Sequence, residues 1–411
     1  MTVSRRAMLG GASAIATLPL VHRARAATRP TVRLGVLTDL SGTYRDNTGP
    51  NSVACAHQAV RDFNPLKHGF DVEMIQADHQ NKPNVASGLA RQWFDEGLAA
   101  VIDVPTSDVA LAVASVAREK DRIMLNASAA SSALTDAQCS PNTIQWSFDT
   151  YMEARSQGGA VVKKGIKKWF FITADYAFGH ILEEQAAAVV KAAGGTVVGR
   201  VRYPFPATTD FSSFLEQAQA SGAQALGLAN AGLDTDNCIK QAHEFGVNKK
   251  MNIAPLLMFI TDVHSVGLEQ AQGLNVTTSF YWNYNDRTRA FTKRVLPHLS
   301  NGAYPNMAHA SAYSITYHYL KTVAAMGAAN ALKSGAATVA RMKGIPTNDD
   351  AFGHGGIRMD GRGEFPAYLW RVKKPSASKM PWDVFTLQTI TPPSGVLHPL
   401  NAKCHFPVTK A

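Results

Sequence analysis

The sequence predicts an α/β protein with two lobes of similar size, each built on a parallel central sheet. Short apolar strands alternate with amphipathic helices over residues 31–126, and the same alternation returns over residues 168–245. This order is typical of parallel strands that are covered by helices on both faces. The length of 411 residues also fits about two domains of roughly 150 residues each.

The first unit shows both kinds of periodicity. Residues 70–75 alternate with period two, which favours a strand, whereas Val85, Leu89 and Trp93 are spaced four apart on one helix face. Pro83 suits the first turn of that helix. The expected elements are, in order, a strand at 31–37, a helix at 51–63, a strand at 70–75, a helix from Pro83, a strand at 99–104, a helix at 108–118 and a strand at 123–126.

The pattern restarts after Pro141. Gly194 and Gly195 are expected to end a helix, because glycine readily adopts the left-handed conformation found at helix C-termini. Asp210 has the side chain of a helix N-cap. The expected elements are a strand at 168–173, a helix at 181–193, a strand at 196–202, a helix at 211–221, a strand at 223–228 and a helix at 234–245.

The last third of the chain is less regular. It predicts a strand at 273–282 and long helices at 286–299 and 308–329. Residues 356–373 favour a β-hairpin, because Asp360-Gly361-Arg362-Gly363 carries strong turn signals. The remaining residues, 374–411, are rich in proline and lysine, and we expect them to wrap over the surface.

The N-terminus has the features of an export signal. Arg5-Arg6 precedes the apolar run 11–21, and Ala24-Arg25-Ala26 offers small residues at the two positions that a signal peptidase reads. The arginine pair favours the twin-arginine route, although Met8 stands where such signals usually carry phenylalanine, and an ordinary Sec signal is the alternative. We expect the mature protein to begin near Ala27, outside the cytoplasm.

Charge and cysteine usage exclude several classes of protein. Residues 1–26 carry four arginines and no acid, so the formal charge falls from +10 to +6 without them, and no run of basic residues suits nucleic acid. No cysteine pair has the spacing of a zinc or thioredoxin site. Cys55 and Cys238 lie in apolar helical patterns, as buried thiols do. Cys139 and Cys404 lie in turn-rich sequence, and we hypothesise a disulfide between them.

Hydroxyl-bearing turns follow three predicted strands of the first unit, at residues 38–44, 105–108 and 126–132. In an open α/β sheet the ligand crevice lies beyond the carboxyl ends of the strands. Small turns before helices can present backbone N–H groups to an anion or a carbonyl oxygen. Plain helix capping is the alternative for each turn. Three such turns in one unit together predict a ligand site.

Several stretches now identify a family resemblance over nearly all of the mature chain. They are Gly35–Leu37 with Leu40–Gly42, Asp78–Lys82, Leu134-Thr135, Asp175–Gly179, Asp210–Ser213 and Tyr313. In this order and spacing the chain resembles the periplasmic leucine/isoleucine/valine-binding family of ABC transporter substrate-binding proteins, which have the type I fold. The resemblance implies two Rossmann-like lobes joined by three hinge crossovers. It also implies a soluble periplasmic monomer without a cofactor, which captures a small molecule and delivers it to a membrane permease and its ATPase.

The resemblance also implies the limits of the lobes. The expected division is an export signal at 1–26, a first lobe at 27–147 plus 281–355, a second lobe at 148–280 plus 356–373, and a C-terminal surface extension at 374–411.

The family's ligand positions carry over only in part. Residues 104–107 match a turn that binds the ligand carboxylate, and residues 126–130 match a second turn, with Ala130 where amino-acid binders often have threonine. Phe178 stands where those binders often have tyrosine. The expected ligand-binding residues are Ser41, Tyr44, Thr106, Ser107, Asn126, Ala127, Ser128, Tyr176, Phe178, Asn230, Ala231, Gly232, Leu257, Tyr281 and Trp282.

One departure bears on the ligand. Residues 256–259 are apolar where amino-acid binders place the acid that holds the α-ammonium group. Burying an ammonium group without a paired charge is costly, so we expect a ligand that lacks an α-ammonium group or that the protein holds in a different way. Asp234 or Asp236 is the alternative partner. Tyr281 and Trp282 are candidates to stack on a planar ligand, with a core role as the alternative. We therefore expect a small carboxylate or amino-acid-like compound, with aromatic compounds among the candidates.

Two other functions are weighed against this hypothesis. The sequence has no P-loop, G-x-S-x-G, H-E-x-x-H or strand-linked G-x-G-x-x-G motif, so we expect no enzyme; a secreted hydrolase or other α/β enzyme is the alternative. Residues 353–356 are glycine-rich but precede a strand rather than a helix, so they do not suit phosphate. A ligand-presenting sensory protein of the same fold is the further alternative.

Overall fold

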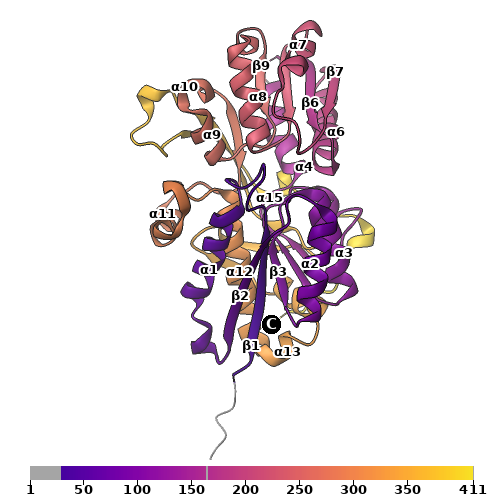
Figure 1. Cartoon of the computed structure of the whole chain (residues 1–411), viewed down its shortest axis with the longest axis vertical. Coiled ribbons are helices and arrows are strands. Elements are labelled where there is room, and N and C mark those ends of the chain that lie inside the picture. Colours follow the sequence, from indigo (N-terminus) through magenta and orange to yellow (C-terminus); the bar gives the residue numbers. More distant parts are fainter. Residues whose placement is uncertain (1–28, 163–164, 411) are drawn as a thin grey trace, which may run out of the picture.

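The computed structural model describes residues 29–162 and 165–410, and the predicted export signal lies outside them. The first lobe contains a parallel sheet of strand order β2-β1-β3-β4-β5 (Figure 1). Val32, Leu34 and Val36 lie on one face of β1, the second strand in this order. All three side chains are buried, so the core packs against this face of the sheet. The strands are β1 (Thr31–Thr38), β2 (Asp71–Asp78), β3 (Ala100–Asp103), β4 (Ile123–Asn126) and β5 (Thr143–Gln145).

Helices cover both faces of this sheet. The long helix α12 packs against α1 on one face, and α2 packs beside α3 on the other. The predicted helix at 286–299 ends at Val295, because Pro297 falls in a following 3₁₀ turn, and the predicted helix at 308–329 ends at Met326, where Gly327 turns the chain. The helices are α1 (Gly49–Phe63), α2 (Pro83–Asp95), α3 (Ser107–Glu119), α11 (Asp286–Val295), α12 (Met307–Met326), α13 (Ala328–Ala331) and α14 (Gly335–Lys343).

The second lobe repeats the architecture with a parallel sheet of order β7-β6-β8-β9. Its central strand β6 is buried along almost its whole length, as its continuous apolar sequence predicts. The strands are β6 (Lys168–Ala174), β7 (Thr196–Tyr203), β8 (Ala225–Ala229) and β9 (Asn252–Pro255). The helices are α4 (Thr150–Glu153), α5 (Gly159–Val162), α6 (Ala177–Ala192), α7 (Ser212–Ala220), α8 (Leu233–Glu244), α9 (Ile260–Val266) and α10 (Leu268–Ala271). The predicted α/β fold with two parallel sheets is thereby confirmed.

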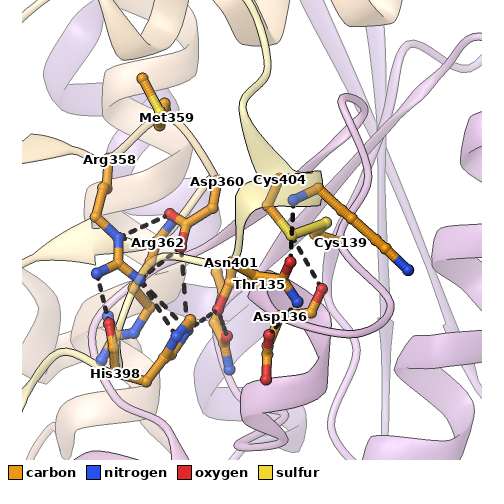
Figure 2. The surroundings of a disulfide bond; sticks show 12 residues. Thr135, Asp136, Cys139, Arg358, Met359, Asp360, Arg362, His398, Asn401 and Cys404 are labelled. Carbon is orange, nitrogen blue, oxygen red and sulfur yellow. Dashed lines mark hydrogen bonds and ion pairs between the residues drawn. A yellow bond between two sulfur atoms is a disulfide. The ribbon is translucent and has the colours of Figure 1, made fainter.

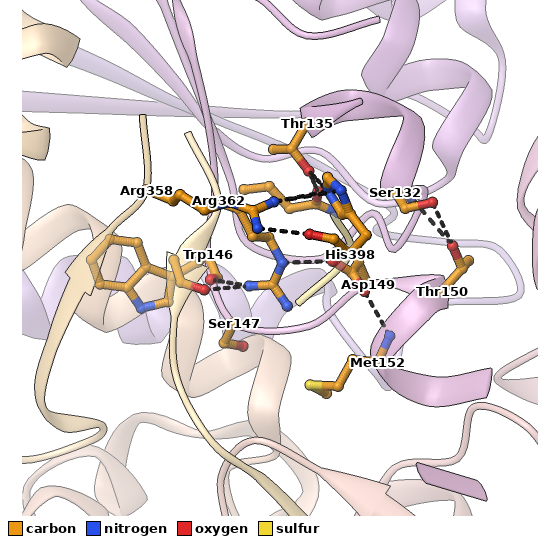
Figure 3. A network of polar contacts seen from close by, with 12 residues as sticks. Ser132, Thr135, Trp146, Ser147, Asp149, Thr150, Met152, Arg358, Arg362 and His398 are labelled. Atoms are coloured by element: carbon orange, nitrogen blue, oxygen red, sulfur yellow. Dashed lines mark hydrogen bonds and ion pairs between the residues drawn. The ribbon is translucent and has the colours of Figure 1, made fainter. Parts of the chain in front are cut away.

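The chain passes between the lobes after β5, after β10 (Asn275–Thr278) and after β13 (Gly363–Glu364). A buried ion pair joins the first and third of these connections: Arg362 Nε donates to Asp149 Oδ2 at 2.7 Å (Figure 3). Ser279 Oγ in the second connection donates to Ser147 Oγ in the first at 2.8 Å. These buried polar contacts hold the three connections together as one hinge.

The predicted hairpin at 356–373 and the predicted strand at 273–282 are both different in the structure. β12 (Gly353–Ile357) does pair with β13 across the expected turn, but Pro366 interrupts the pairing. The chain then continues as β14 (Ala367–Val372), which pairs with the short β10 and with β15 (Phe385–Thr391). Gly361 O accepts a hydrogen bond from Gln145 N, so this turn lies on the first sheet rather than in the second lobe.

The C-terminal tail, residues 392–410, does more than cover the surface. It leaves β15 in the β10-β14-β15 sheet, passes the hinge near α15 (Pro393–Val396) and ends against the first lobe. A disulfide joins Cys404 to Cys139, with Cα atoms 5.9 Å apart, and Asn401 Nδ2 donates to Asp136 Oδ1 nearby (Figure 2). The pairing hypothesised from the sequence is therefore present, while Cys55 and Cys238 are buried free thiols.

Removing this disulfide is expected to destabilise the fold. The double variant Cys139→Ser/Cys404→Ser should lose about 2–4 kcal/mol of unfolding free energy, because the cross-link spans 265 positions of sequence and restricts the unfolded chain. Urea denaturation followed by circular dichroism measures the loss, and dithiothreitol should shift the wild-type midpoint in the same direction. An unchanged midpoint in both tests would contradict a stabilising role.

Candidate ligand-binding site

A cavity lies between the two lobes, at the carboxyl ends of their strands. Its volume, measured as the space open to the centre of a water molecule, is about 30 Å³. Both lobes contribute to the lining, which consists of Tyr44, Asn47, Thr48, Pro105, Thr106, Ser107, Ser128, Ala129, Ala130, Tyr176, Phe178, Ala231, Leu257 and Phe259. This is the place where an open α/β sheet binds its ligand.

The turn between β3 and α3 forms the polar floor of the cavity. Asp103, Val104 and Thr106 have φ angles of 81°, 57° and 73°, in the left-handed region that residues other than glycine rarely adopt. Such strain is concentrated at functional sites. Thr106 is the N-cap of α3 but makes no capping hydrogen bond, and its side chain is turned toward Asn81, to whose Oδ1 it donates. The first N–H groups of α3 beside Ser107 are therefore left for a ligand.

The turn after β4 forms the adjoining wall. Asn126 Oδ1 accepts hydrogen bonds from Ser128 N at 3.2 Å and Ala129 N at 2.9 Å, and its Nδ2 donates to Ala129 O. Asn126 thus fixes the backbone of the turn without lining the cavity, and Ala127 is buried in the core. Of the residues expected here, Ser128 lines the cavity and the other two support it.

Tyr44 comes from the loop after β1, which Asp39 holds in place. The Asp39 carboxylate accepts hydrogen bonds from Gly42 N at 2.6 Å, Tyr44 N at 2.9 Å and Asn81 Nδ2 at 2.7 Å. Ser41, in the same loop, points away and donates its hydroxyl to Asp78 Oδ2, so it does not line the cavity.

The second lobe supplies an aromatic wall. Tyr176 and Phe178 lie at the start of α6, and the Tyr176 hydroxyl meets the Tyr44 hydroxyl of the first lobe at 2.6 Å. Phe205 stacks on Tyr176, with ring centroids 4.5 Å apart, and on Tyr44 at 5.5 Å. Burial raises the pKa of both tyrosines well above its usual range, so both hydroxyls stay protonated near neutral pH.

The turns after β8 and β9 complete this wall. Ala231 and Leu257 line the cavity, whereas Asn230 accepts a hydrogen bond from Thr235 Oγ1 at 2.7 Å and supports the turn from the inside. Gly232 has a φ of 62° and approaches Thr43 O of the first lobe so closely that a Cβ atom would lie 2.6 Å from that oxygen. Gly232 is therefore a contact between the lobes rather than a lining residue.

Further hydrogen bonds between the lobes show that the structure is closed. Asn47 Nδ2 donates to Asp262 Oδ1 at 2.6 Å, and Leu233 N donates to Thr43 O at 3.3 Å. Asp262 lies near Asp236 beneath this contact. Burial raises the pKa of both carboxyl groups, and repulsion from Asp262 adds to the shift at Asp236.

The cavity lining contains no charged side chain. Asp234 instead accepts a hydrogen bond from Tyr203 OH at 2.7 Å, and burial raises the pKa of Asp234 to about 7. Asp236 is also absent from the lining. Neither of these two acids therefore stands where it could pair with a ligand ammonium group in this closed structure. No group of His, Cys, Asp and Glu side chains among the described residues is arranged to hold a metal ion.

Tyr281 and Trp282 do not line the cavity. Trp282 Nε1 donates to Trp382 O at 2.8 Å, and the Tyr281 ring packs against Trp370, with centroids 4.9 Å apart. Both rings belong to the core beside the hinge, which is the alternative role considered for them. Their sequence position after β10 could not reveal this, because their main partners come from residues 370–385, and the pairing of β14 with β10 and β15 was not predicted.

Sequence reasoning missed six lining residues. Asn47 and Thr48 follow the expected turn at 38–44 by three and four positions, so a wider window would have included them, whereas Ala129 and Ala130 lie within the expected turn at 126–132. Phe259 lies in the apolar stretch that was noted only for its missing acid. The sixth is Pro105, which lies within the expected turn after β3.

Known proteins share this fold and part of its sequence. Residues 31–379 match the family model described as periplasmic binding protein. A periplasmic binding protein from Burkholderia mallei is 43% identical, covers 91% of this chain and 98% of its own, and superposes with a TM-score of 0.85. A branched chain amino acid ABC transporter periplasmic ligand-binding protein from Burkholderia xenovorans is 37% identical, with 90% and 97% coverage and a TM-score of 0.77.

The curated relatives match over a shorter range. The Leu/Ile/Val-binding protein homolog 6 of Brucella abortus is 28% identical over 205 residues, which are 49% of this chain. The chain spans about half the length of the curated relatives it matches (52%). The family model and the solved structures, by contrast, extend over most of both lobes and of the cavity between them. The chain therefore belongs to the periplasmic binding protein family.

Proposed function

We propose that the protein is the solute-binding component of an ABC importer and that it captures a small carboxylate. The ligand that we favour is a carboxylate with an aromatic ring. The cleft closes over its ligand and the closed form is delivered to a membrane permease with its ATPase. The family relationship supports capture and delivery, since its members are binding proteins rather than enzymes. The residues of the cavity support the choice of ligand.

The uncapped N-terminus of α3, opening into an aromatic cavity, is the observation that carries this proposal. A carboxylate there would accept hydrogen bonds from first-turn N–H groups and from the Ser107 hydroxyl, and the helix dipole would favour its charge. Tyr44, Tyr176, Phe178 and Phe259 surround the rest of the space and suit a planar ring. No acid in the lining compensates an ammonium group, which disfavours α-amino acids.

Two proteins of the same fold were solved with aromatic carboxylates. Solute-binding proteins of Rhodopseudomonas palustris were solved in complex with benzoate and with 4-hydroxybenzoate, and their TM-scores to this chain are 0.77 and 0.75. Because they are only 20% and 21% identical to it, they support the fold alone. The ligand assignment rests on the cavity of this chain.

Isothermal titration calorimetry with benzoate, 4-hydroxybenzoate and leucine tests the assignment. We expect the two aromatic carboxylates to bind and leucine to bind at least about tenfold more weakly, because its ammonium group would be buried without a partner. Ser107→Ala should weaken carboxylate binding by about 10- to 100-fold, the loss of one hydrogen bond to a charged group.

Ser41→Ala is the matched control, because Ser41 belongs to an expected site turn but points away from the cavity. Its affinity for benzoate should equal that of the wild type. Preferential binding of leucine would overturn the ligand class and keep the importer. Turnover of a titrated compound would instead favour the alternative of a secreted enzyme.

Export and assembly complete the proposal. Arg5-Arg6 and Ala24–Ala26 support passage by the twin-arginine route and cleavage near Ala26, which would place a monomer in the periplasm. No helix among residues 29–162 and 165–410 is both long and apolar enough to cross a membrane. Mass spectrometry of the exported protein would give its first residue, and an N-terminus far from Ala27 would contradict this part of the proposal.

A further inference from the structure

Asp103 is a buried carboxyl group directly behind the cavity wall. It ends β3 and is 0% exposed, with Oδ2 accepting a hydrogen bond from Thr38 Oγ1 at 2.6 Å and Oδ1 accepting one from Ser128 Oγ. Ser128 in turn lines the cavity. No lysine, arginine or histidine among the described residues forms an ion pair with Asp103. A negative charge at this position is thus compensated by hydroxyl groups alone.

The hydroxyl of Ser128 has a single proton to donate. While Asp103 is ionised, Ser128 commits that proton to Asp103 Oδ1 and presents only lone pairs to the cavity. Lone pairs repel the oxygens of a carboxylate ligand. If Asp103 carries a proton on Oδ1, it becomes the donor to Ser128 Oγ, and Ser128 can turn its own proton toward the ligand. Thr38 still donates to Oδ2 in both states.

The surroundings of Asp103 favour the protonated state when an anion is bound. The titratable groups that face it are Asp39 after β1 and Cys55 on α1, and neither supplies a positive charge near neutral pH. Burial raises the pKa of Asp103 to about 6, although its bonds to Ser128 and Thr38 oppose the shift. A carboxylate at the adjacent N-terminus of α3 would add a second negative charge and raise that pKa further.

We propose that Asp103 takes up a proton when a carboxylate ligand enters the cleft, and that this proton frees the Ser128 hydroxyl to bind the ligand. Asp103 is then a specificity-determining residue that never touches the ligand. The inference rests on the proposed function, and it adds that capture of a carboxylate is coupled to pH. Because the bound state holds the extra proton, affinity for a carboxylate rises as pH falls from about 8 to about 6.

Calorimetry with benzoate in two buffers of different ionisation enthalpy measures the proton uptake. We expect it to approach one proton per ligand near pH 7, and the affinity to change by up to about tenfold per pH unit. Asp103→Asn should abolish this uptake and flatten the pH profile, because its amide group can donate to Ser128 at every pH. Asparagine also tolerates the left-handed backbone of this position, so the variant is expected to fold.

Two further variants distinguish Asp103 from other sources of proton uptake on ligand binding. Asp236→Asn removes one carboxyl group of the buried pair Asp236 and Asp262, whose protonation closure would also favour, and it should leave the Asp103-linked uptake in place. Ser128→Ala should lower the affinity more near pH 6 than near pH 8, which a purely structural role would not produce. Benzoate binding without proton uptake, or uptake that survives in Asp103→Asn, overturns the inference but not the proposed function. Failure of every carboxylate to bind overturns both.

Discussion

Arg362→Met is expected to lower the free energy of unfolding by about 3–5 kcal/mol, because it leaves Asp149 as a buried charge without its partner. Both side chains are almost completely inaccessible to water, and Arg362 also donates to Trp146 O at 2.7 Å and Gly363 O at 2.8 Å. These contacts join two of the three connections between the lobes, as Figure 3 shows. Urea denaturation followed by circular dichroism would measure the loss.

A second substitution separates the lost ion pair from lost packing. Asp149→Asn keeps the oxygen that accepts the hydrogen bond from Met152 N at 2.8 Å, and it removes the charge. The double variant Asp149→Asn/Arg362→Met should therefore be more stable than Arg362→Met alone. If the two substitutions destabilise additively, the charge of Asp149 is not the source of the loss.

Gly232→Ala is expected to weaken ligand binding by at least about tenfold while the separate lobes stay folded. The added Cβ would meet Thr43 O at 2.6 Å, and this contact exists only when the lobes are closed. Opening relieves it, so the substitution raises the free energy of the closed form, and ligand affinity falls by the same factor. Calorimetry with the ligand, together with small-angle X-ray scattering of the complex, would report both effects.

Gly267→Ala is the matched control. Gly267 has φ 84° and ψ 147°, and Gly232 has φ 62° and ψ −140°, so both lie in a backbone region that only glycine adopts readily, but a Cβ at Gly267 meets no atom within 4 Å. It should introduce comparable backbone strain without any effect on closure. Equal losses of affinity in the two variants would show that strain, rather than the contact with Thr43, accounts for the result at Gly232.

Much of the fold follows from local sequence patterns. The alternation of strands and helices over residues 31–126 and 168–245 predicts both parallel sheets, because each strand carries its own apolar signal. The pairing of β14 with β10 and β15 could not be predicted in the same way. β15 is mostly exposed and weakly apolar, and its partner lies in a connection that the sequence presents as the second arm of a hairpin.

The site was predictable to the extent that it follows the strands. Thr106, Ser107, Ser128 and Tyr176 come directly after strand ends, and the topology brings them to one cavity. The role of Asp103 was not visible, because a single acid at the end of an apolar strand carries no local signal. Its burial and its bond to Ser128 depend on how two neighbouring strands align.

The position of Trp282 has a consequence for optical measurements. Trp93, Trp146, Trp169, Trp282, Trp370 and Trp382 are all outside the cavity lining, so no indole ring can be quenched by direct contact with a bound molecule. Trp282 and Trp382 instead lie together beside the hinge. A change of tryptophan emission on adding a ligand would therefore report the movement of the lobes. Intrinsic fluorescence thus measures closure of the cleft rather than contact between the ligand and an indole ring.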